Sequence, residues 1–329
     1  MLRRSFMGAL LGAFGALGFL TAADDADADA EKAADKKPAH KVVTVEKDKN
    51  GVTVTLQCAN APYPVKDGKW DDPTVIVFVP EHFRMKKSGK VDAVVHFHGH
   101  LTTARNAIEG HHLREQLTEA RQNAILVVPQ GPMFARSGDF GKLMLKGGLA
   151  KLLKEAVKLV GSSKEARAQL DKATLAGVKD VRRVVVSAHS GGYRAAAAVA
   201  QRGRVELREI YLFDSLYGEE DVFEKWLTSK QGRKLISYSV GGPPHENGKK
   251  LAESLKAHGM KVIVEELGSH ITREQLTKGR AIFLLGRGTH SGATWQEKGL
   301  RDCLFASCLT GHGTAAWHKE KDKKRGPAN

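Results

Sequence analysis

The sequence has few of the residues on which several classes of protein depend. Three cysteines among 329 residues cannot form the dense disulfide framework of a small secreted scaffold. Only one apolar stretch, near the N-terminus, could enter a membrane, which excludes a protein with several spans. No glycine-rich loop has Walker or dinucleotide spacing, and no tract mixes basic and aromatic residues. We therefore expect no cofactor and no nucleic acid partner.

The composition is that of a globular protein with a strong excess of basic residues. Hydrophobic residues make up 41% of the chain and charged residues 27%, which is typical of a folded domain. Lysine and arginine number 52 against 37 aspartate and glutamate residues, and the formal net charge is +15. This charge favours anionic surroundings, such as the polymers and lipid headgroups of a cell envelope.

The N-terminal segment predicts export. Residues 1–23 contain Arg3 and Arg4, then an apolar run shorter than the roughly 20 residues of a membrane span, then small residues typical of a cleavage site. A general secretory signal and a twin-arginine signal both remain open. Residues 24–40 predict a disordered linker. We expect a periplasmic or extracellular protein without a stable membrane anchor after cleavage.

Residues 41–312 predict one α/β domain, followed by a charged C-terminal tail at 313–329. Strand-like segments at 42–45 and 52–56 flank a turn signal and indicate an antiparallel hairpin. Apolar strands then alternate with helical segments, the first of them at 103–121. Continuous apolar strands are typical of a parallel sheet that is covered on both faces. The pattern predicts a doubly wound, mostly parallel sheet without a large cap domain.

A short segment at residues 184–192, VVVSAHSGG, carries the clearest chemical signal. It reads as a strand of β-branched residues, a sharp turn of small residues around Ser190, and the start of a helix. Chemistry in parallel sheets occurs where a strand ends and a helix begins. The segment resembles the nucleophile elbow of the α/β-hydrolase superfamily, with Ala188 in place of the first glycine of G-x-S-x-G.

The resemblance implies an oxyanion hole beside Ser190. The run His98-Gly99-His100 follows an apolar strand, at the place where superfamily members carry an HG motif. The resemblance assigns the two donors to the backbone amides of Gly191 and His100. Three side chains near these loops are expected to contact the substrate: His98, Gln130 and His189.

The resemblance also implies the order serine, acid, histidine along the chain. His290 follows the last apolar strand and is the favoured base, with His270 as the alternative. Asp214 ends an apolar strand and is the favoured acid, with Glu246 as the alternative. Together these residues imply an exported serine hydrolase that cleaves an ester or amide bond through an acyl-enzyme. A carboxylic ester of the cell envelope is the expected substrate class, while amidase and peptidase activities remain open.

A cluster of histidines supports a second interpretation. His96, His98 and His100 alternate, as ligands of a zinc ion on one face of a strand do, and would make a zinc-dependent hydrolase. His111 and His112 are expected on an exposed helix face. A third interpretation is an inactive hydrolase fold that serves as a binding protein, because fold alone does not establish chemistry.

The three cysteines allow one disulfide in an oxidising compartment. Cys303 and Cys308 are close enough in sequence to pair, which would leave Cys58 as a free thiol. Helical spacing would place the first two side chains on different faces.

Overall fold

The computed structural model describes residues 40–62, 72–134, 138–170, 175–265, 273–286, 288–296 and 299–311. The signal peptide, most of the linker, the C-terminal tail and His270 lie outside these ranges, so their predictions stay predictions. Within the described ranges, no helix is both long and apolar enough to cross a membrane.

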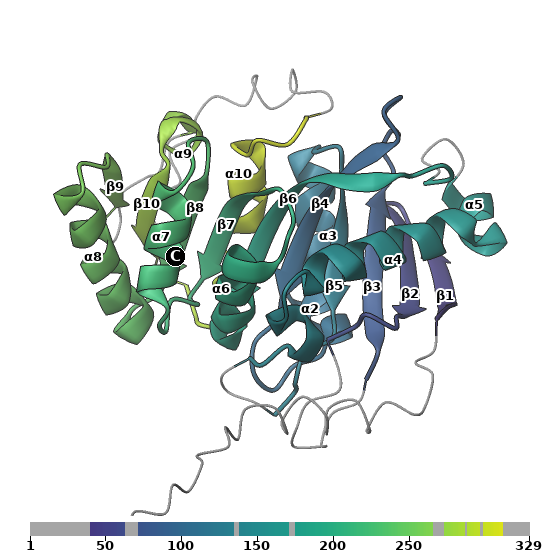
Figure 1. The fold of residues 1–329 in the computed structure, drawn as a ribbon, viewed down its shortest axis with the longest axis horizontal. Coiled ribbons are helices and arrows are strands. Elements are labelled where there is room, and N and C mark those ends of the chain that lie inside the picture. Colours follow the sequence, from purple (N-terminus) through teal and green to yellow (C-terminus); the bar gives the residue numbers. More distant parts are fainter. Residues whose placement is uncertain are drawn as a thin grey trace, which may run out of the picture. The chain divides into compact units, whose positions relative to one another are not determined.

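Four strands come first along the described chain, and strands and helices then alternate (Figure 1). The strands are β1 (Lys41–Lys47), β2 (Gly51–Gln57), β3 (Thr74–Pro80), β4 (Lys90–Phe97), β5 (Ala124–Pro129), β6 (Asp180–His189), β7 (Leu207–Phe213), β8 (Lys234–Ser239), β9 (Val262–Glu265) and β10 (Ala281–Leu285). The helices are α2 (Ala104–Gly110), α3 (Leu113–Ala120), α4 (Gly148–Ser162), α5 (Lys164–Leu170), α6 (Tyr193–Arg202), α7 (Glu220–Thr228), α8 (Gly242–Ala257), α9 (Arg273–Lys278) and α10 (Gly299–Phe305). Two short 3₁₀ turns, η1 (Gly141–Met144) and η3 (Ser190–Gly192), complete the set.

All ten strands form one sheet, in the order β1-β2-β3-β5-β4-β6-β7-β8-β10-β9. The first three strands pair antiparallel, β3 is antiparallel to β5, and every other neighbouring pair is parallel. The central strands are continuous apolar runs because helices cover both of their faces. The predicted α/β-hydrolase fold, with its N-terminal antiparallel hairpin, is confirmed by this order and these directions.

Two apolar cores lie on opposite faces of the sheet. One is formed with α4, α5, α6, α7 and α8, and the other with α2, α3, α9 and α10 (Figure 1). Helix α4 belongs to the first core because its apolar side chains, among them Leu149, Leu152 and Leu153, are buried. Helix α4 therefore forms part of a helical layer on this face of the sheet.

The helix predicted at 103–121 is two helices in the structure, α2 and α3. The break falls at His111 and His112, and His112 has a φ of 50°, in the left-handed region. A left-handed residue cannot continue an α-helix, so the chain turns here. The turn buries the His111 side chain, whereas His112 stays exposed. The expectation that both lie on an exposed helix face is therefore wrong for His111.

The cysteines are free thiols in the structure. Cys58 and Cys303 are buried and Cys308 is half-buried, and no disulfide joins them. Burial raises the pKa of the Cys303 and Cys308 thiols to about 12. Both therefore stay protonated and unreactive at neutral pH.

Candidate active site

The turn after β6 holds Ser190 in a strained conformation. Ser190 has a φ of 51°, which a serine adopts only when its surroundings require it. The Ser215 hydroxyl donates to the Ser190 carbonyl at 2.7 Å and fixes the turn from the neighbouring strand end. A β-carbon at Gly192 would lie 2.5 Å from the carbonyl oxygen of Phe97, so this position requires glycine. The sequence segment 184–192 therefore forms the sharp strand-to-helix turn that it predicts.

The structure brings Ser190, His290 and Asp214 together from three separate strand ends. His290 Nε2 lies 2.9 Å from Ser190 Oγ, and His290 Nδ1 lies 2.5 Å from Asp214 Oδ2. Asp214 is buried at the end of β7, and its Oδ1 accepts the backbone N–H of Val240 at 3.1 Å. These bonds place a proton on Nδ1 and leave Nε2 free to accept the serine proton.

The alternative acid lies elsewhere in the fold. Glu246 is exposed on α8 and forms an ion pair with Lys249, at 3.7 Å. The backbone N–H of Val240, just after β8, donates to Asp214 Oδ1 and not to Glu246. The carboxylate that lies beside the His290 imidazole is therefore that of Asp214, at the end of β7.

The loop after β4 lies directly against the serine. A β-carbon at Gly99 would be 2.7 Å from Cβ of Ser190, so only glycine permits this approach. His98 Nδ1 donates to the Gly99 carbonyl at 2.9 Å, and His98 Nε2 accepts the Gly131 N–H at 2.7 Å. The Gly99 carbonyl and the His100 N–H share one planar peptide and point in opposite directions. The His98 hydrogen bond therefore fixes the direction of the His100 amide.

Three predicted substrate contacts are buried side chains that bond to the protein itself. His98, Gln130 and His189 are only 1%, 4% and 6% exposed. Gln130 Oε1 accepts the Ala104 N–H at 2.9 Å, and His189 Nε2 donates to the His290 carbonyl at 2.7 Å. The backbone groups of the loops around Ser190 are buried and need hydrogen-bond partners, which these side chains provide. In the structure these side chains support the loops, and their contact with substrate stays a prediction.

The histidine cluster does not form a zinc site. His96 Nδ1 bonds Ser187 Oγ at 3.0 Å, and His96 Nε2 bonds His111 Nδ1 at 3.3 Å. His98 likewise uses both ring nitrogens in backbone contacts. A metal ion would have to break these bonds to use either ring. Across the described ranges, no group of three His, Cys, Asp or Glu side chains is placed to hold a metal.

His96, His111 and His189 form a buried row of rings that ends at the exposed His290, and the sequence pattern does not predict this row. Ring centroids are 5.4 Å apart between His96 and His111, 4.7 Å between His111 and His189, and 4.9 Å between His189 and His290. The row reaches from the core to the end of the sheet where Ser190 and His290 lie. Only the helix break at His111 could have indicated it, because without that break His111 would lie on the outer face.

Burial keeps His96, His98, His111 and His189 neutral, which predicts a loss of stability in acid. Burial lowers the pKa of His98 and His189 from 6.5 to about 4, and that of His111 to about 3. Below pH 6.5 the unfolded chain binds protons that the folded chain does not, so stability falls as pH falls. Burial also holds the pKa of His96 well below 6.5. Each such histidine lowers the free energy of unfolding by about 1.4 kcal/mol per pH unit, and the four together lower it by about 5.5 kcal/mol per pH unit.

Urea denaturation at pH 7.5, 6.0 and 5.0 measures this loss, and His189→Gln should reduce the slope by about a quarter. Carboxyl groups do not explain a loss of stability between pH 7.5 and 5.0. In Asp92 and Glu155 burial is outweighed by hydrogen bonds, so their pKa values lie below the ordinary 3.8 and 4.5. Equal denaturation midpoints at pH 7.5 and 5.0 would contradict the prediction.

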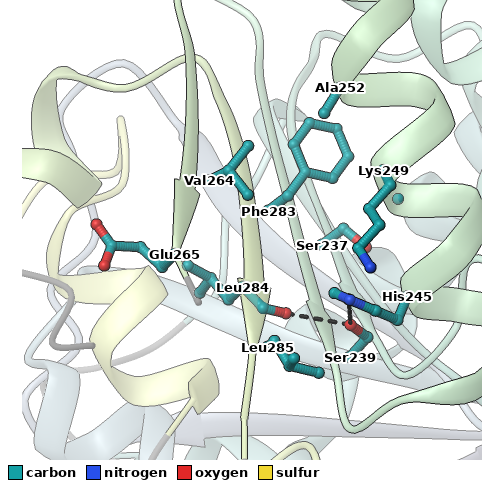
Figure 2. Close-up of a pocket in the computed structure, with 11 residues that line it drawn as sticks. Ser237, Ser239, His245, Lys249, Ala252, Val264, Glu265, Phe283, Leu284 and Leu285 are labelled. Atoms are coloured by element: carbon teal, nitrogen blue, oxygen red, sulfur yellow. Dashed lines mark hydrogen bonds between the residues drawn. The ribbon is translucent and has the colours of Figure 1, made fainter. Parts of the chain in front are cut away.

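A second Ser–His contact, between α8 and the strands β8, β9 and β10, lacks the other features of a catalytic site (Figure 2). Ser239 Oγ lies 3.4 Å from His245 Nδ1, and the hydroxyl already donates to the Leu284 carbonyl. The pocket has a volume of about 20 Å³, enough for one water molecule. Glu265, the one carboxylate in its lining, points away from His245 (Figure 2).

Comparison with known proteins finds solved structures with a similar fold. No protein-family model matches the chain, and no curated protein matches it. The feruloyl esterase module from Clostridium thermocellum, complexed with sinapinate, is 12% identical with a TM-score of 0.46, over 84% of this chain and 97% of that one. An S-formylglutathione hydrolase from Agrobacterium tumefaciens is 14% identical with a TM-score of 0.40, over 80% and 99%. Brefeldin A esterase, a bacterial homologue of human hormone-sensitive lipase, is 15% identical with a TM-score of 0.36, over 90% and 89%.

Each of these neighbours is named as an esterase or a hydrolase. The strand order and strand directions of this chain, rather than these distant likenesses, carry the assignment of the fold. The chain has the α/β-hydrolase fold, with a serine, a histidine and an aspartate in contact at one edge of its sheet.

Proposed function

We propose that this chain is a serine hydrolase that cleaves carboxylic esters through an acyl-enzyme. The observation that carries the proposal is the continuous hydrogen-bonded series Ser190–His290–Asp214. The strained turn at Ser190 supports it, because backbone strain of this kind is concentrated at functional sites.

The reaction follows from the placement of these groups. His290 Nε2 accepts the Ser190 proton as Oγ attacks the carbonyl carbon of the ester, and Asp214 stabilises the imidazolium that forms. The amides of His100 and Gly191 donate to the resulting oxyanion. His290 returns the proton to the departing alcohol, which leaves an acyl-serine. Water, deprotonated by His290, then attacks that acyl group and releases the acid and Ser190.

An ester is the proposed substrate because an alcohol leaves the tetrahedral intermediate more readily than an amine does. The mature protein should hydrolyse p-nitrophenyl esters, and a fluorophosphonate probe should label the peptide that contains Ser190. A folded protein that neither hydrolyses the esters nor reacts with the probe would refute the proposal. That outcome would favour an inactive hydrolase fold that acts as a binding protein.

Exposed apolar side chains near the serine support an ester with a bulky apolar group. Leu101, Phe134 and Tyr217 are 61%, 70% and 39% exposed, which is costly for large apolar groups that contact no ligand. Leu101 follows His100, and its N–H donates to the Met133 carbonyl at 2.7 Å, which brings Phe134 to the same loop pair. The Tyr217 ring lies 6.4 Å from the His290 ring, on the other catalytic loop.

The double variant Leu101→Ser, Phe134→Ser tests this substrate class. We expect kcat/KM for p-nitrophenyl octanoate to fall about 30- to 900-fold, because each of the two lost apolar contacts is worth roughly 1 to 2 kcal/mol. The acetate ester should change little. Val43→Ser is the matched control, since Val43 is also exposed but lies on the edge strand β1. An equal loss for both esters would contradict the assignment.

We further propose that the enzyme acts outside the cytoplasm, on the cell envelope. Residues 1–23 have the pattern of an export signal, and the formal net charge of +15 suits an anionic surface. Fractionation of cells that produce the full chain should recover a shortened protein outside the cytoplasm. Recovery of the uncleaved chain from the cytoplasm would refute this proposal.

A further inference from the structure

The residue before Ser190 also contacts the catalytic histidine. His189 ends β6, and its side chain is 6% exposed between the rings of His290 and His111. Its Nε2 donates to the backbone carbonyl of His290 at 2.7 Å, across 101 positions of sequence. The contact is with the backbone of the base and not with its reacting nitrogen.

The protonation state of His189 follows from its surroundings. A carbonyl oxygen can only accept, so Nε2 must carry the hydrogen. Among the described residues Nδ1 is buried without a hydrogen-bond partner, so none of them stabilises a second hydrogen there. Burial also lowers the pKa of His189 to about 4. The ring is thus neutral and restricted to one tautomer, which makes it a donor of fixed direction.

The backbone of His290 has little else to hold it at this point. His290 lies in the segment 288–296, which the structure forms from turns rather than from a strand or helix. Its carbonyl otherwise accepts only a long contact from the Ala293 N–H, at 3.4 Å. The short bond from His189 is therefore the main restraint on this carbonyl among the described residues.

We propose that His189 is a positioning residue that ties the base to the nucleophile. His189 and Ser190 are joined by a peptide bond, so a hydrogen bond from His189 to His290 sets the distance between Ser190 Oγ and His290 Nε2. Catalysis is sensitive to that distance, because a misplacement of about 1 Å can cost roughly 100-fold in rate. The inference rests on the proposed serine hydrolase function.

Two variants of His189 separate hydrogen bonding from packing. His189→Phe keeps a flat ring between His290 and His111 but has no donor. His189→Gln places an amide nitrogen the same number of bonds from the backbone as Nε2, and so keeps the donor. We expect kcat to fall about 10- to 100-fold in the Phe variant, with KM within about threefold, and the Gln variant to recover most of kcat.

Full kcat in a folded Phe variant would overturn the inference, and so would equal losses in both variants. Labelling of the unaltered protein by a fluorophosphonate tests the proposed function separately. The downfield proton resonance of His290 Nδ1–H, bonded to Asp214, gives a readout that needs no activity. It should persist in the Gln variant and shift or broaden in the Phe variant, and an unchanged resonance in the Phe variant would refute the inference.

Discussion

Ser190→Ala should lower kcat for ester hydrolysis by about 10⁴- to 10⁶-fold, because the variant has no nucleophile and its remaining groups act only on water. The loss should fall on kcat rather than on KM, since the serine hydroxyl contributes little to ground-state binding. Alanine also removes the atom to which the fluorophosphonate probe bonds, so labelling should disappear together with hydrolysis.

Steady-state kinetics and intact mass after probe treatment measure this result. Ser162→Ala is the matched control, because Ser162 lies at the end of α4 and its hydroxyl only donates to the Leu159 carbonyl. The Ser190→Ala protein should keep the denaturation midpoint of the unaltered chain. Residual hydrolysis above one part in a hundred, with a folded protein, would place the nucleophile elsewhere.

Asp214→Asn should lower kcat by about 10³- to 10⁴-fold. The Val240 N–H holds Oδ1 at 3.1 Å, so asparagine would keep its carbonyl there and turn its amide group toward His290 Nδ1. That amide donates and favours the imidazole tautomer with its hydrogen on Nε2, which cannot accept the serine proton. The variant also lacks the negative charge that stabilises the imidazolium.

Glu246→Gln is the matched control for this experiment, because Glu246 is exposed and paired with Lys249 on α8. Its kcat should equal that of the unaltered protein. If Glu246→Gln lost activity and Asp214→Asn kept it, the acid would have been misassigned. Both variants are close in size to the original side chain, so thermal unfolding should differ little between them.

Local pattern predicted much of the fold. The β-branched run before Ser190 forms the end of β6, and the apolar run before Asp214 forms β7, because buried parallel strands need continuous apolar residues. The helix expected at 103–121 was not divided correctly. Its break depends on the left-handed backbone of His112, which no periodicity in apolar residues reveals.

The candidate site was less evenly predictable. Each of the three residues Ser190, His290 and Asp214 follows an apolar strand. Because these strands are parallel, their carboxyl ends lie at the same end of the sheet, which brings the three residues together there. The positions of His98 and Gln130 do not follow in this way, because burial and partners depend on loops far apart in sequence. A polar residue at a strand end can face substrate or satisfy a buried backbone group, and the sequence is the same in both cases.

The sequence by itself determined the order of strands and helices, the class of fold and Ser190 as the candidate nucleophile. Short-range chemistry is enough for these, since apolar period, turn residues and chain order act within a few neighbours. The tertiary structure alone decided which histidines are buried, which tautomer His98 and His189 adopt, and that Asp214 rather than Glu246 lies beside His290. Those outcomes depend on hydrogen bonds between loops about 30 to 100 positions apart, and only the folded chain brings such loops into contact.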